Sequence, residues 1–309
     1  MSAVAWVTGA RGFIGRHVAR EAASRGQIVH GIGHGEWQQP DRTGWGVRSW
    51  TSADVTMETL DRLMITSAPP DIVYHLAGGA SVAASMSDPF GDFNRTVGSA
   101  AQLLEWIRTR VPQARLVFAS SAAVYGDSAV SPISSGSAAK PVSPYGHHKA
   151  ICESLINNYS TSFELSAVVV RLFSVYGPGL RKQILWDISR RLAQSCDPIE
   201  LGGTGGETRD MIHVLDAACM MVNAAQHAGS PPPVFNIGTG VGSPVRAIAE
   251  SVIRAWPSGA GLVFSGLSRP GDPKHLVADL GRGELVPPRS FIGLEDGIAG
   301  FVDALIRDD

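Results

Sequence analysis

Short apolar runs alternate with amphipathic segments through the first half of the chain. Each run is bounded by turn residues, as in a buried strand, and the segments between runs place apolar residues at helical spacing. We predict strands at Val4–Val7, Ile28–Ile32, Ile72–Leu76, Leu116–Ala119 and Ser166–Leu172, and helices at Gly12–Arg25, Met57–Ile65, Thr96–Thr109 and Tyr145–Ser160. Regular alternation of this kind predicts an α/β fold whose parallel sheet is covered by helices on both faces.

The pattern changes after Gly177-Pro178-Gly179 to helices, glycine turns and isolated short strands. Residues 202–206 are predicted as a tight turn between two short strands, and Val234–Ile237 as a further strand. A helix is predicted over Pro244–Trp256, with Ser243 as its N-cap and the proline at the first helical position.

Composition is that of an ordinary globular enzyme, with 44% hydrophobic and 17% charged residues. The net charge of −2 gives no global attraction to nucleic acid or to an anionic membrane, so a bound anion must be held by local groups. No apolar run approaches the roughly 18 residues of a membrane span. Because the first strand runs straight into a glycine motif, we expect no signal peptide and a cytoplasmic protein.

The three cysteines are Cys152, Cys196 and Cys219. Their wide spacing matches no metal-binding pattern, so no metal site is predicted. Buried free thiols in a reducing compartment are the expected state.

A glycine-rich loop, Thr8–Gly15, follows the first strand and opens the first helix. Glycines at this place permit a tight turn and close approach of backbone to a pyrophosphate, which sits on the helix N-terminus. The loop predicts a dinucleotide cofactor held by Gly9, Arg11, Gly12, Phe13, Ile14 and Gly15.

The cofactor loop and the change of pattern together predict two lobes. Residues 1–175 with 211–240 form a dinucleotide-binding domain around a Rossmann-type, doubly wound parallel sheet. Residues 176–210 with 241–309 form a smaller α+β lobe for the substrate.

The second strand lacks the acid that usually holds the ribose of NAD. Gly33 and His34 stand where that acid is expected. Its absence removes the repulsion against a 2′-phosphate, and Arg11 and His34 could supply positive partners, so NADP is favoured. The alternative is NAD, with the acid displaced, for instance to Glu36.

Further cofactor contacts are predicted after the third and fourth strands. Asp54 and Val55 fall where a turn after a third strand would meet the adenine. Leu76 ends the fourth strand and is predicted to contact the cofactor together with Ala77 and Gly78. The segment Ala77-Gly78-Gly79 is small enough for close approach of the cofactor.

Tyr145 and Lys149 are four residues apart, about one helical turn, so their side chains share a helix face. An ammonium beside a phenol stabilises the phenolate and lowers the pKa of the Tyr. Such a phenol can exchange the proton of a carbinol while a hydride moves elsewhere. A solvated helix face has the same spacing, so the pair indicates catalysis only together with the cofactor loop.

With these motifs in order, the chain resembles the extended short-chain dehydrogenase/reductases, and most closely their branch of nucleotide-sugar epimerases, dehydratases and 4-keto reductases. The resemblance covers nearly the whole chain. It rests on Thr8–Gly15, His75–Ala77, Ser120–Gly126, Tyr145–Lys149, Arg171–Pro178, Arg209–Val214 and Arg269–Asp272.

The resemblance implies roles for individual residues. Tyr145 would be the acid/base, Lys149 would bind the nicotinamide ribose and tune the Tyr, and Ser121 would hydrogen-bond the substrate oxygen. Arg209 and Arg269 would grip the diphosphate of a nucleotide-sugar substrate, because the guanidinium fork suits phosphate oxygens. Ser174 and Asp272 fall in the same substrate-binding motifs.

Three departures from the family pattern restrict these expectations. Ala122-Ala123 stands where family dehydratases carry an Asp-Glu pair, which argues against dehydration. Ser174 and Thr96 each replace an Asn that many relatives have, so the sugar preference of a relative is not transferred.

Two activities use this residue set. A 4-keto reductase spends NADPH once per turnover, whereas a 4-epimerase keeps NAD bound and returns the hydride to the other face of the sugar. The missing acid favours the reductase, with the epimerase as the alternative. The alternative from another class is a non-catalytic module that senses NAD(P), which typically lacks the Tyr or the Lys.

Other features are assigned mainly structural roles. His147 and His148 are interpreted as helix-surface residues, and Trp37, Trp45 and Trp50 as packing for a long loop, with stacking near the adenine as an alternative. Residues 181–183 either close over the substrate or begin a solvated helix. In relatives the helices near 96–109 and 145–160 pair into a four-helix interface, so a homodimer is expected.

Overall fold

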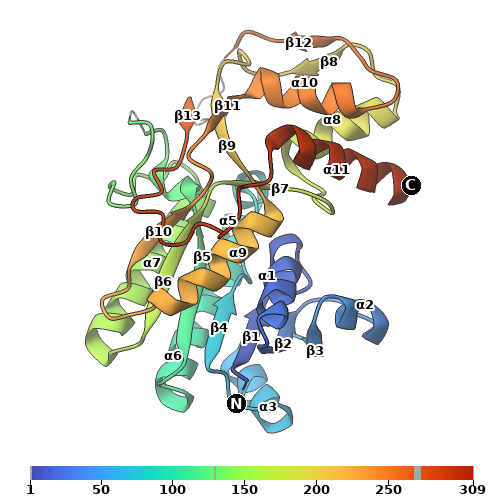
Figure 1. Cartoon of the computed structure of the whole chain (residues 1–309). Coiled ribbons are helices and arrows are strands. Elements are labelled where there is room, and N and C mark those ends of the chain that lie inside the picture. Colours follow the sequence, from blue (N-terminus) through green and yellow to red (C-terminus); the bar gives the residue numbers. More distant parts are fainter. Residues whose placement is uncertain (1, 129, 268–272, 309) are drawn as a thin grey trace.

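A seven-stranded parallel sheet forms the centre of the larger lobe in the computed structural model, which describes residues 2–128, 130–267 and 273–308 (Figure 1). Its strand order, β10-β6-β5-β4-β1-β2-β3, confirms the predicted Rossmann-type fold. The strands are β1 Val4–Thr8, β2 Ile28–Gly33, β3 Val47–Ser52, β4 Ile72–His75, β5 Arg115–Ser121, β6 Ala167–Leu172 and β10 Val234–Ile237.

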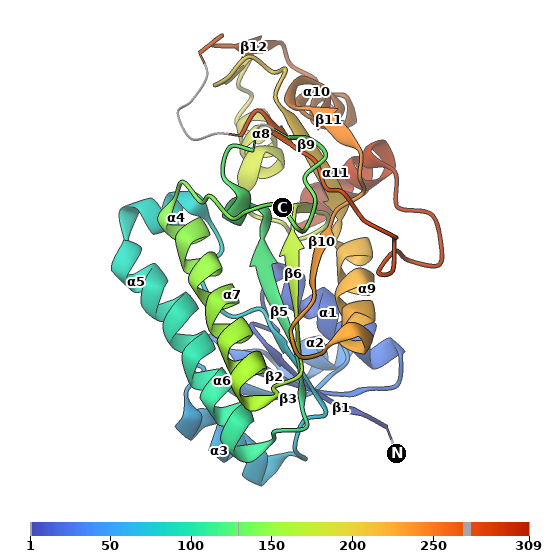
Figure 2. The same cartoon turned by 90° about the vertical axis from the view of Figure 1, so that its left-hand side faces the viewer.

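Helices cover both faces of the sheet (Figure 2). Within β1, Ala5 and Val7 pack beneath α1 and α9, while Val4 and Trp6 pack toward α3, α6 and α7 on the opposite face. Because both faces of the strand are buried, residues 4–7 form a continuous apolar run without polar alternation. These helices are α1 Phe13–Ser24, α3 Met57–Thr66, α6 Ser99–Arg110, α7 Pro144–Phe163 and α9 Val214–Ala224.

The predicted helix at Thr96–Thr109 is part of a longer helical run. It begins with α5, Pro89–Phe93, continues through a π-helical turn, Asn94–Gly98, and becomes α6. Asp88 is the N-cap of α5, and its side chain accepts a hydrogen bond from the Gly91 N–H. Apolar periodicity did not reveal this start, nor the short helices α2, Gln39–Gly44, and α4, Val82–Ser87.

The smaller lobe contains two short sheets and three helices among the residues that the structure describes. Strands β7, β9, β11 and β13 form one sheet, and β8 pairs with β12. The elements are β7 Ser174–Tyr176, α8 Gln183–Ala193, β8 Ile199–Leu201, β9 Thr208–His213, β11 Gly242–Pro244, α10 Val245–Ala255, β12 Leu262–Phe264, β13 His275–Leu276 and α11 Leu294–Asp308.

One local prediction in this lobe is confirmed and another needs correction. Residues 202–206 connect the strands β8 and β9, as predicted, although these strands belong to different sheets. Ser243 is not the N-cap of α10, because it lies in β11 and Pro244 occupies the cap position. The strand at Val234–Ile237 is confirmed as β10.

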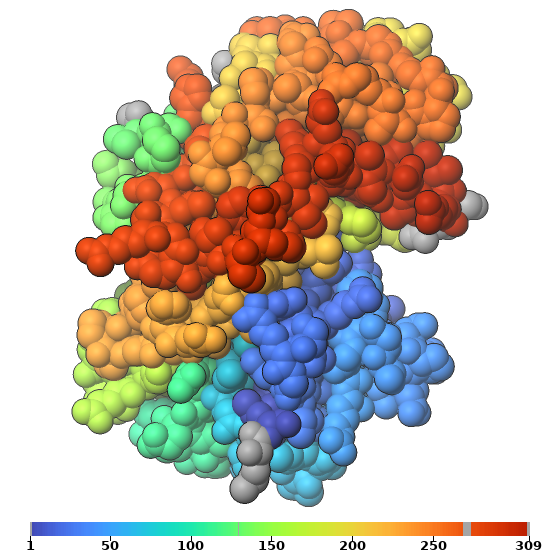
Figure 3. All heavy atoms as spheres, in the orientation of Figure 1, coloured from blue at the N-terminus to red at the C-terminus, as the bar shows by residue number. Residues whose placement is uncertain are grey.

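Asp210, on β9, joins the two lobes. Its buried carboxylate accepts hydrogen bonds from the N–H groups of Thr239 and Gly240, after β10, and from the N–H of Ala278. The orange-to-red C-terminal residues then run from the upper lobe down over α9 (Figure 3), where Leu285 enters the core of the larger lobe. We keep the division into two lobes, with its residue boundaries, as a proposal.

The cysteine prediction holds for two residues. Cys152 and Cys219 are buried free thiols, but Cys196 is exposed in the turn after α8. Among the described residues, no helix is both long enough and apolar enough to cross a membrane.

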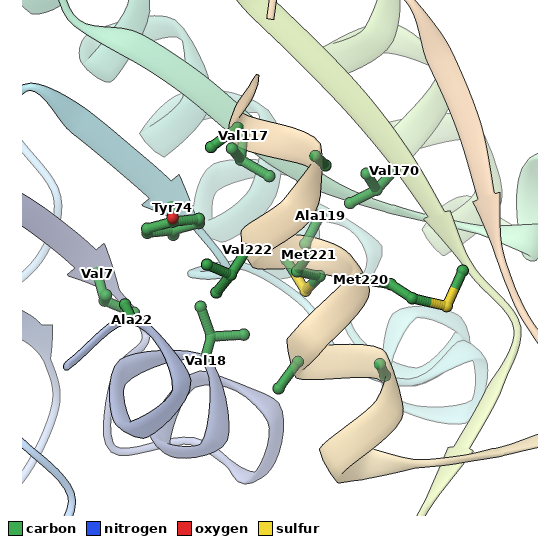
Figure 4. Close-up of a cluster of buried hydrophobic side chains, with 14 of the residues drawn as sticks. Val7, Val18, Ala22, Tyr74, Val117, Ala119, Val170, Met220, Met221 and Val222 are labelled. Carbon is green, nitrogen blue, oxygen red and sulfur yellow. The ribbon is translucent and has the colours of Figure 1, made fainter. Parts of the chain in front are cut away.

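Met221 provides a test of the α9 side of the core. Its side chain is fully buried with Val222 among residues of α1 and the sheet (Figure 4). Met221→Ala should lower the free energy of unfolding by about 2–5 kcal/mol, because it leaves a cavity in the packed core. Urea unfolding followed by circular dichroism measures the change.

The matched control is Leu215→Ala on the same helix, where the side chain is 42% exposed. Its effect should stay below about 1 kcal/mol. Equal effects of the two changes would contradict the packing of α9.

Candidate active site

A cavity of about 840 Å³ opens at the carboxyl ends of β1 to β6. This edge of a doubly wound sheet is where such folds bind their ligands. The cavity brings together every residue that the sequence predicts for the cofactor: Gly9, Arg11, Gly12, Phe13, Ile14, Gly15, His34, Asp54, Val55, Leu76, Ala77, Gly78, Tyr145 and Lys149.

The glycine loop is shaped so that backbone, not side chains, faces the cavity. Gly9 has φ of 70°, a conformation that glycine adopts without strain. A Cβ on Gly15 would collide with the Gly9 carbonyl oxygen, so α1 begins in direct contact with the loop. No acidic residue lies in the first turn of α1, which leaves its N-terminal N–H groups available to a phosphate. These residues fit a dinucleotide pyrophosphate.

The end of β2 explains the missing acid. A Cβ on Gly33 would lie 2.9 Å from the indole of Trp50, so a larger side chain there would displace the Trp. A carboxylate nevertheless stands nearby, because Asp54 Oδ1 lies 3.1 Å from His34 Nε2. Glu36, the acid considered from the sequence, is not among the residues that line the cavity. Trp50 lines it, with Trp37 packed edge-on against the indole.

Ser121, Tyr145 and Lys149 come together through the close approach of α7 to the turn after β5. Ser143 caps α7 by accepting a hydrogen bond from the Gly146 N–H. A Cβ on Gly146 would lie 2.6 Å from the carbonyl oxygen of Ala123, so glycine permits this contact. Ser121 thereby reaches hydrogen-bond range of the Tyr145 hydroxyl, one helical turn from Lys149.

Lys149 is buried behind Tyr145. Its ammonium donates to the Ala119 carbonyl oxygen at 2.8 Å and lies 5.9 Å from the centre of the Tyr145 ring. Burial lowers the pKa of Lys149, and burial raises the pKa of Tyr145, which the hydrogen bond with Ser121 partly offsets. The sequence predicted a lowered Tyr pKa. In the structure the pKa of Tyr145 is raised instead, because desolvation of the phenolate is the largest effect on it.

His148 corrects the interpretation of the two adjacent histidines. His147 is exposed, as predicted, but His148 is buried and its Nδ1 lies 2.6 Å from Asp92 Oδ2. Asp92, from α5, is 1% exposed, and its Oδ1 has no hydrogen-bond partner within the described part of the chain. The same carboxylate adds to the upward shift of the Tyr145 pKa, after burial. No sequence motif pairs Asp92 with His148, because the two are 56 residues apart.

Other parts of the site were not anticipated. The π-helical turn and the start of α6 form one wall of the cavity, through Asn94, Arg95, Gly98, Ser99 and Gln102. Thr96, which replaces a family Asn, accepts a hydrogen bond from the Gly79 N–H at 2.8 Å. It therefore holds the loop after β4.

Of the residues other than Ser121 that are predicted to bind the substrate, two do not line the cavity and two lie outside the described part of the chain. Ser174, on β7, and Arg209, on β9, are not among the residues lining the cavity, and the Arg209 guanidinium donates to the carbonyl oxygens of Thr208 and Pro273. Arg269 and Asp272 lie outside the described residues. Lys182, just before α8, lines the cavity from the smaller lobe.

Comparisons with known proteins agree with this geometry. The sequence pattern described as "NAD dependent epimerase/dehydratase family" matches residues 5–238. The UDP-glucose 4-epimerase of Azospirillum brasilense is 30% identical over 303 residues, covering 89% of this chain and 84% of that protein.

Two solved structures are similar over the whole fold. The UDP-glucose 4-epimerase of Thermus thermophilus, in complex with NAD, is 26% identical, with a TM-score of 0.84 and coverage of 98% of this chain and 99% of the other. The UDP-glucuronic acid 4-epimerase from Bacillus cereus, in complex with UDP-glucuronic acid and NAD, is also 26% identical, with a TM-score of 0.85 and coverage of 99% and 100%.

The buried Asp92–His148 pair gives a stability prediction. His148→Ala should lower the free energy of unfolding by about 1–3 kcal/mol, because it leaves the Asp92 carboxylate buried without a partner. The matched control, His147→Ala, changes an exposed neighbour and should cost less than about 0.5 kcal/mol. Chemical denaturation of both variants measures the difference.

A second variant separates the pair from simple loss of packing. Adding Asp92→Asn to His148→Ala should recover part of the lost stability, because the unpaired charge is removed. Additive losses in the double variant would argue against a coupled pair.

Proposed function

The chain belongs to the NAD dependent epimerase/dehydratase family, and on that premise we propose that it is an NAD-dependent 4-epimerase of a nucleotide-diphosphate sugar. Membership agrees with the resemblance drawn from the sequence. The sequence favoured a 4-keto reductase, with a 4-epimerase as the alternative. We adopt the 4-epimerase because the similar proteins are named as 4-epimerases.

One observation carries the proposal: Tyr145 and Lys149 line the same cavity as the glycine loop, and Ser121 is hydrogen-bonded to Tyr145. Bound NAD would take up a hydride from the sugar and return it. The protein supplies the proton chemistry, with Tyr145 removing the proton of the C4 hydroxyl and giving it back. The Ser121 hydroxyl would hold the same oxygen by a hydrogen bond.

The electrostatics of Tyr145 fit a reversible step. Burial raises the pKa of Tyr145, so the phenol keeps its proton in the free site. The ammonium of Lys149, 5.9 Å from the centre of the Tyr145 ring, favours the phenolate when the proton is transferred. Tyr145 is thereby suited to acting first as a base and then as an acid.

Asp54 supports NAD over NADP. Its carboxylate lies at the rim of the cavity beyond β2 and would repel a 2′-phosphate, as the usual acid does. Arg11 and His34, the expected phosphate partners, also line the cavity, but the imidazole of His34 already contacts Asp54. We therefore assign the ribose-binding acid to Asp54, in the loop after β3, in place of the adenine contact expected from the sequence.

Three wider features remain part of the proposal. The substrate is a UDP-linked sugar, although the similar proteins are named for both UDP-glucose and UDP-glucuronic acid. The protein is cytoplasmic, and it is a homodimer through α6 and α7. The apolar residues of α7 that are exposed, and so available to a dimer interface, are Ile151 and Phe163. Five other apolar side chains of α6 and α7 pack inward and are buried: Leu103, Leu104, Trp106, Ile107 and Ile156.

Retention of cofactor distinguishes the epimerase from the reductase. Purified protein should carry NAD through gel filtration, released on denaturation and identified by chromatography, because an epimerase reuses the same cofactor. Incubation with a UDP-hexose and no added nicotinamide should produce its C4 epimer, detected by proton NMR. Consumption of NADPH with a 4-keto sugar, and no epimerisation, would instead establish the reductase.

Tyr145→Phe tests the proton-transfer role. Loss of the hydroxyl should reduce kcat by about 10²–10⁴-fold, the usual contribution of a positioned acid/base, while NAD remains bound. Tyr159→Phe is the matched control. Tyr159 lies on the same helix, far along α7 from Tyr145, and its hydroxyl contacts Glu105 of α6. Unchanged turnover in Tyr145→Phe would favour a non-catalytic binding module.

The raised pKa of Tyr145 also sets the direction of the pH dependence. Sugar oxidation needs the phenolate, so kcat/KM of the wild-type protein should increase with pH on the acidic side of the Tyr145 pKa. A profile of kcat/KM that declines across this range would contradict Tyr145 as the base.

A further inference from the structure

Lys182 reaches from the smaller lobe into the cavity of the larger one. It is the residue before α8, and its ammonium donates to the carbonyl oxygen of Ala80, after β4, at 2.7 Å. Its side chain lines the same cavity as Tyr145 and Lys149. From the sequence, residues 181–183 are expected either to close over the substrate or to begin a solvated helix. The structure places Lys182 at the cavity.

The ammonium of Lys182 has no carboxylate partner among the described residues. None of the ion pairs in that part of the chain includes it, and its hydrogen bond goes to a neutral carbonyl. Burial lowers the pKa of Lys182, so the charged form is poorly solvated. A desolvated cation without a counter-charge gains most from an anion carried by the ligand.

The position of Lys182 indicates which part of the ligand carries that anion. Lys182 lines the same cavity as Tyr145 and Lys149, and its ammonium is held at Ala80, two residues after Gly78, which also lines that cavity. The pyrophosphate of the dinucleotide belongs instead at the glycine loop and the start of α1. The Arg209 motif, expected to grip the substrate diphosphate, lies outside the cavity lining.

A hexuronic acid carries its only sugar charge on C5, next to the reacting C4 atom. A neutral hexose has a hydroxymethyl group there, which offers no charge to an ammonium. We propose that Lys182 binds the C6 carboxylate of a nucleotide-linked hexuronic acid, making that acidic sugar the preferred substrate. The inference rests on the proposed 4-epimerase function and identifies its substrate class.

Binding would exchange one partner of Lys182 for another. With an acidic sugar, the carboxylate replaces the carbonyl oxygen of Ala80 and forms a charge-assisted hydrogen bond. With a neutral sugar, the ammonium keeps its carbonyl partner and contributes little to discrimination. Lys182 therefore acts as a specificity residue and takes no part in the proton transfer at Tyr145.

Lys182→Gln tests the assignment, because the amide can still donate to the carbonyl oxygen of Ala80 but has no charge. Epimerisation of UDP-glucuronic acid and of UDP-glucose is measured on the wild-type protein and the variant. We expect wild type to favour UDP-glucuronic acid by at least about tenfold. The variant should lose about 10–100-fold in kcat/KM on that substrate, with a loss on UDP-glucose at least about tenfold smaller.

Arg181→Gln is the matched control. Arg181 is the exposed neighbour whose guanidinium lies over the Trp186 ring, so its change should leave the ratio of the two substrates unaltered. Equal losses on both substrates in Lys182→Gln, or a wild-type preference for UDP-glucose, would overturn the assignment.

Calorimetry separates this inference from the proposed function. If neither sugar is epimerised, the 4-epimerase proposal fails, but binding of UDP-glucuronic acid still tests Lys182. Weaker binding of UDP-glucuronic acid to Lys182→Gln, with a smaller change for UDP-glucose, supports the carboxylate contact. Unchanged binding of UDP-glucuronic acid overturns it.

Discussion

Parallel pairing of the seven strands is the constraint on which the rest of the structure depends. Parallel strands end at one edge of a sheet, so the loops after β1, β2, β3 and β4 and the ends of β5 and β6 open into a single cavity although they lie far apart in the sequence. The strands must also be buried on both faces, which requires the helices that flank them. One of these helices, α7, delivers Tyr145 and Lys149 to that edge. The position of the site follows from the sheet before any side chain is considered.

Much of this arrangement is predictable because it depends on local patterns. The apolar runs locate the buried strands, and the glycine loop after β1 indicates the cofactor end of the sheet. The spacing of Tyr145 and Lys149 places both on one helix face, and the structure keeps them there. Such features need only periodicity and turn chemistry, which the sequence contains in short segments.

The remaining features depend on contacts between distant segments. His148 is buried because Asp92, on another helix, lies beside it, and helix periodicity alone placed it on the surface. Gly33 lacks the usual acid because Trp50 packs against it, and Asp54 brings a carboxylate from the next loop. Lys182 crosses between lobes to reach Ala80. Each pairing is set by tertiary packing, which no spacing in the sequence encodes.

The contact between Gly146 and Ala123 has a consequence for how this chain can diversify. The segment between residues 126 and 142 leaves the site after the turn that follows β5 and returns at the start of α7, and both ends are held by that contact. The spacing of Ser121 and Tyr145 in space is therefore independent of the number of residues between them. Insertions and deletions in this excursion can therefore change its length while the proton-transfer geometry is inherited unchanged.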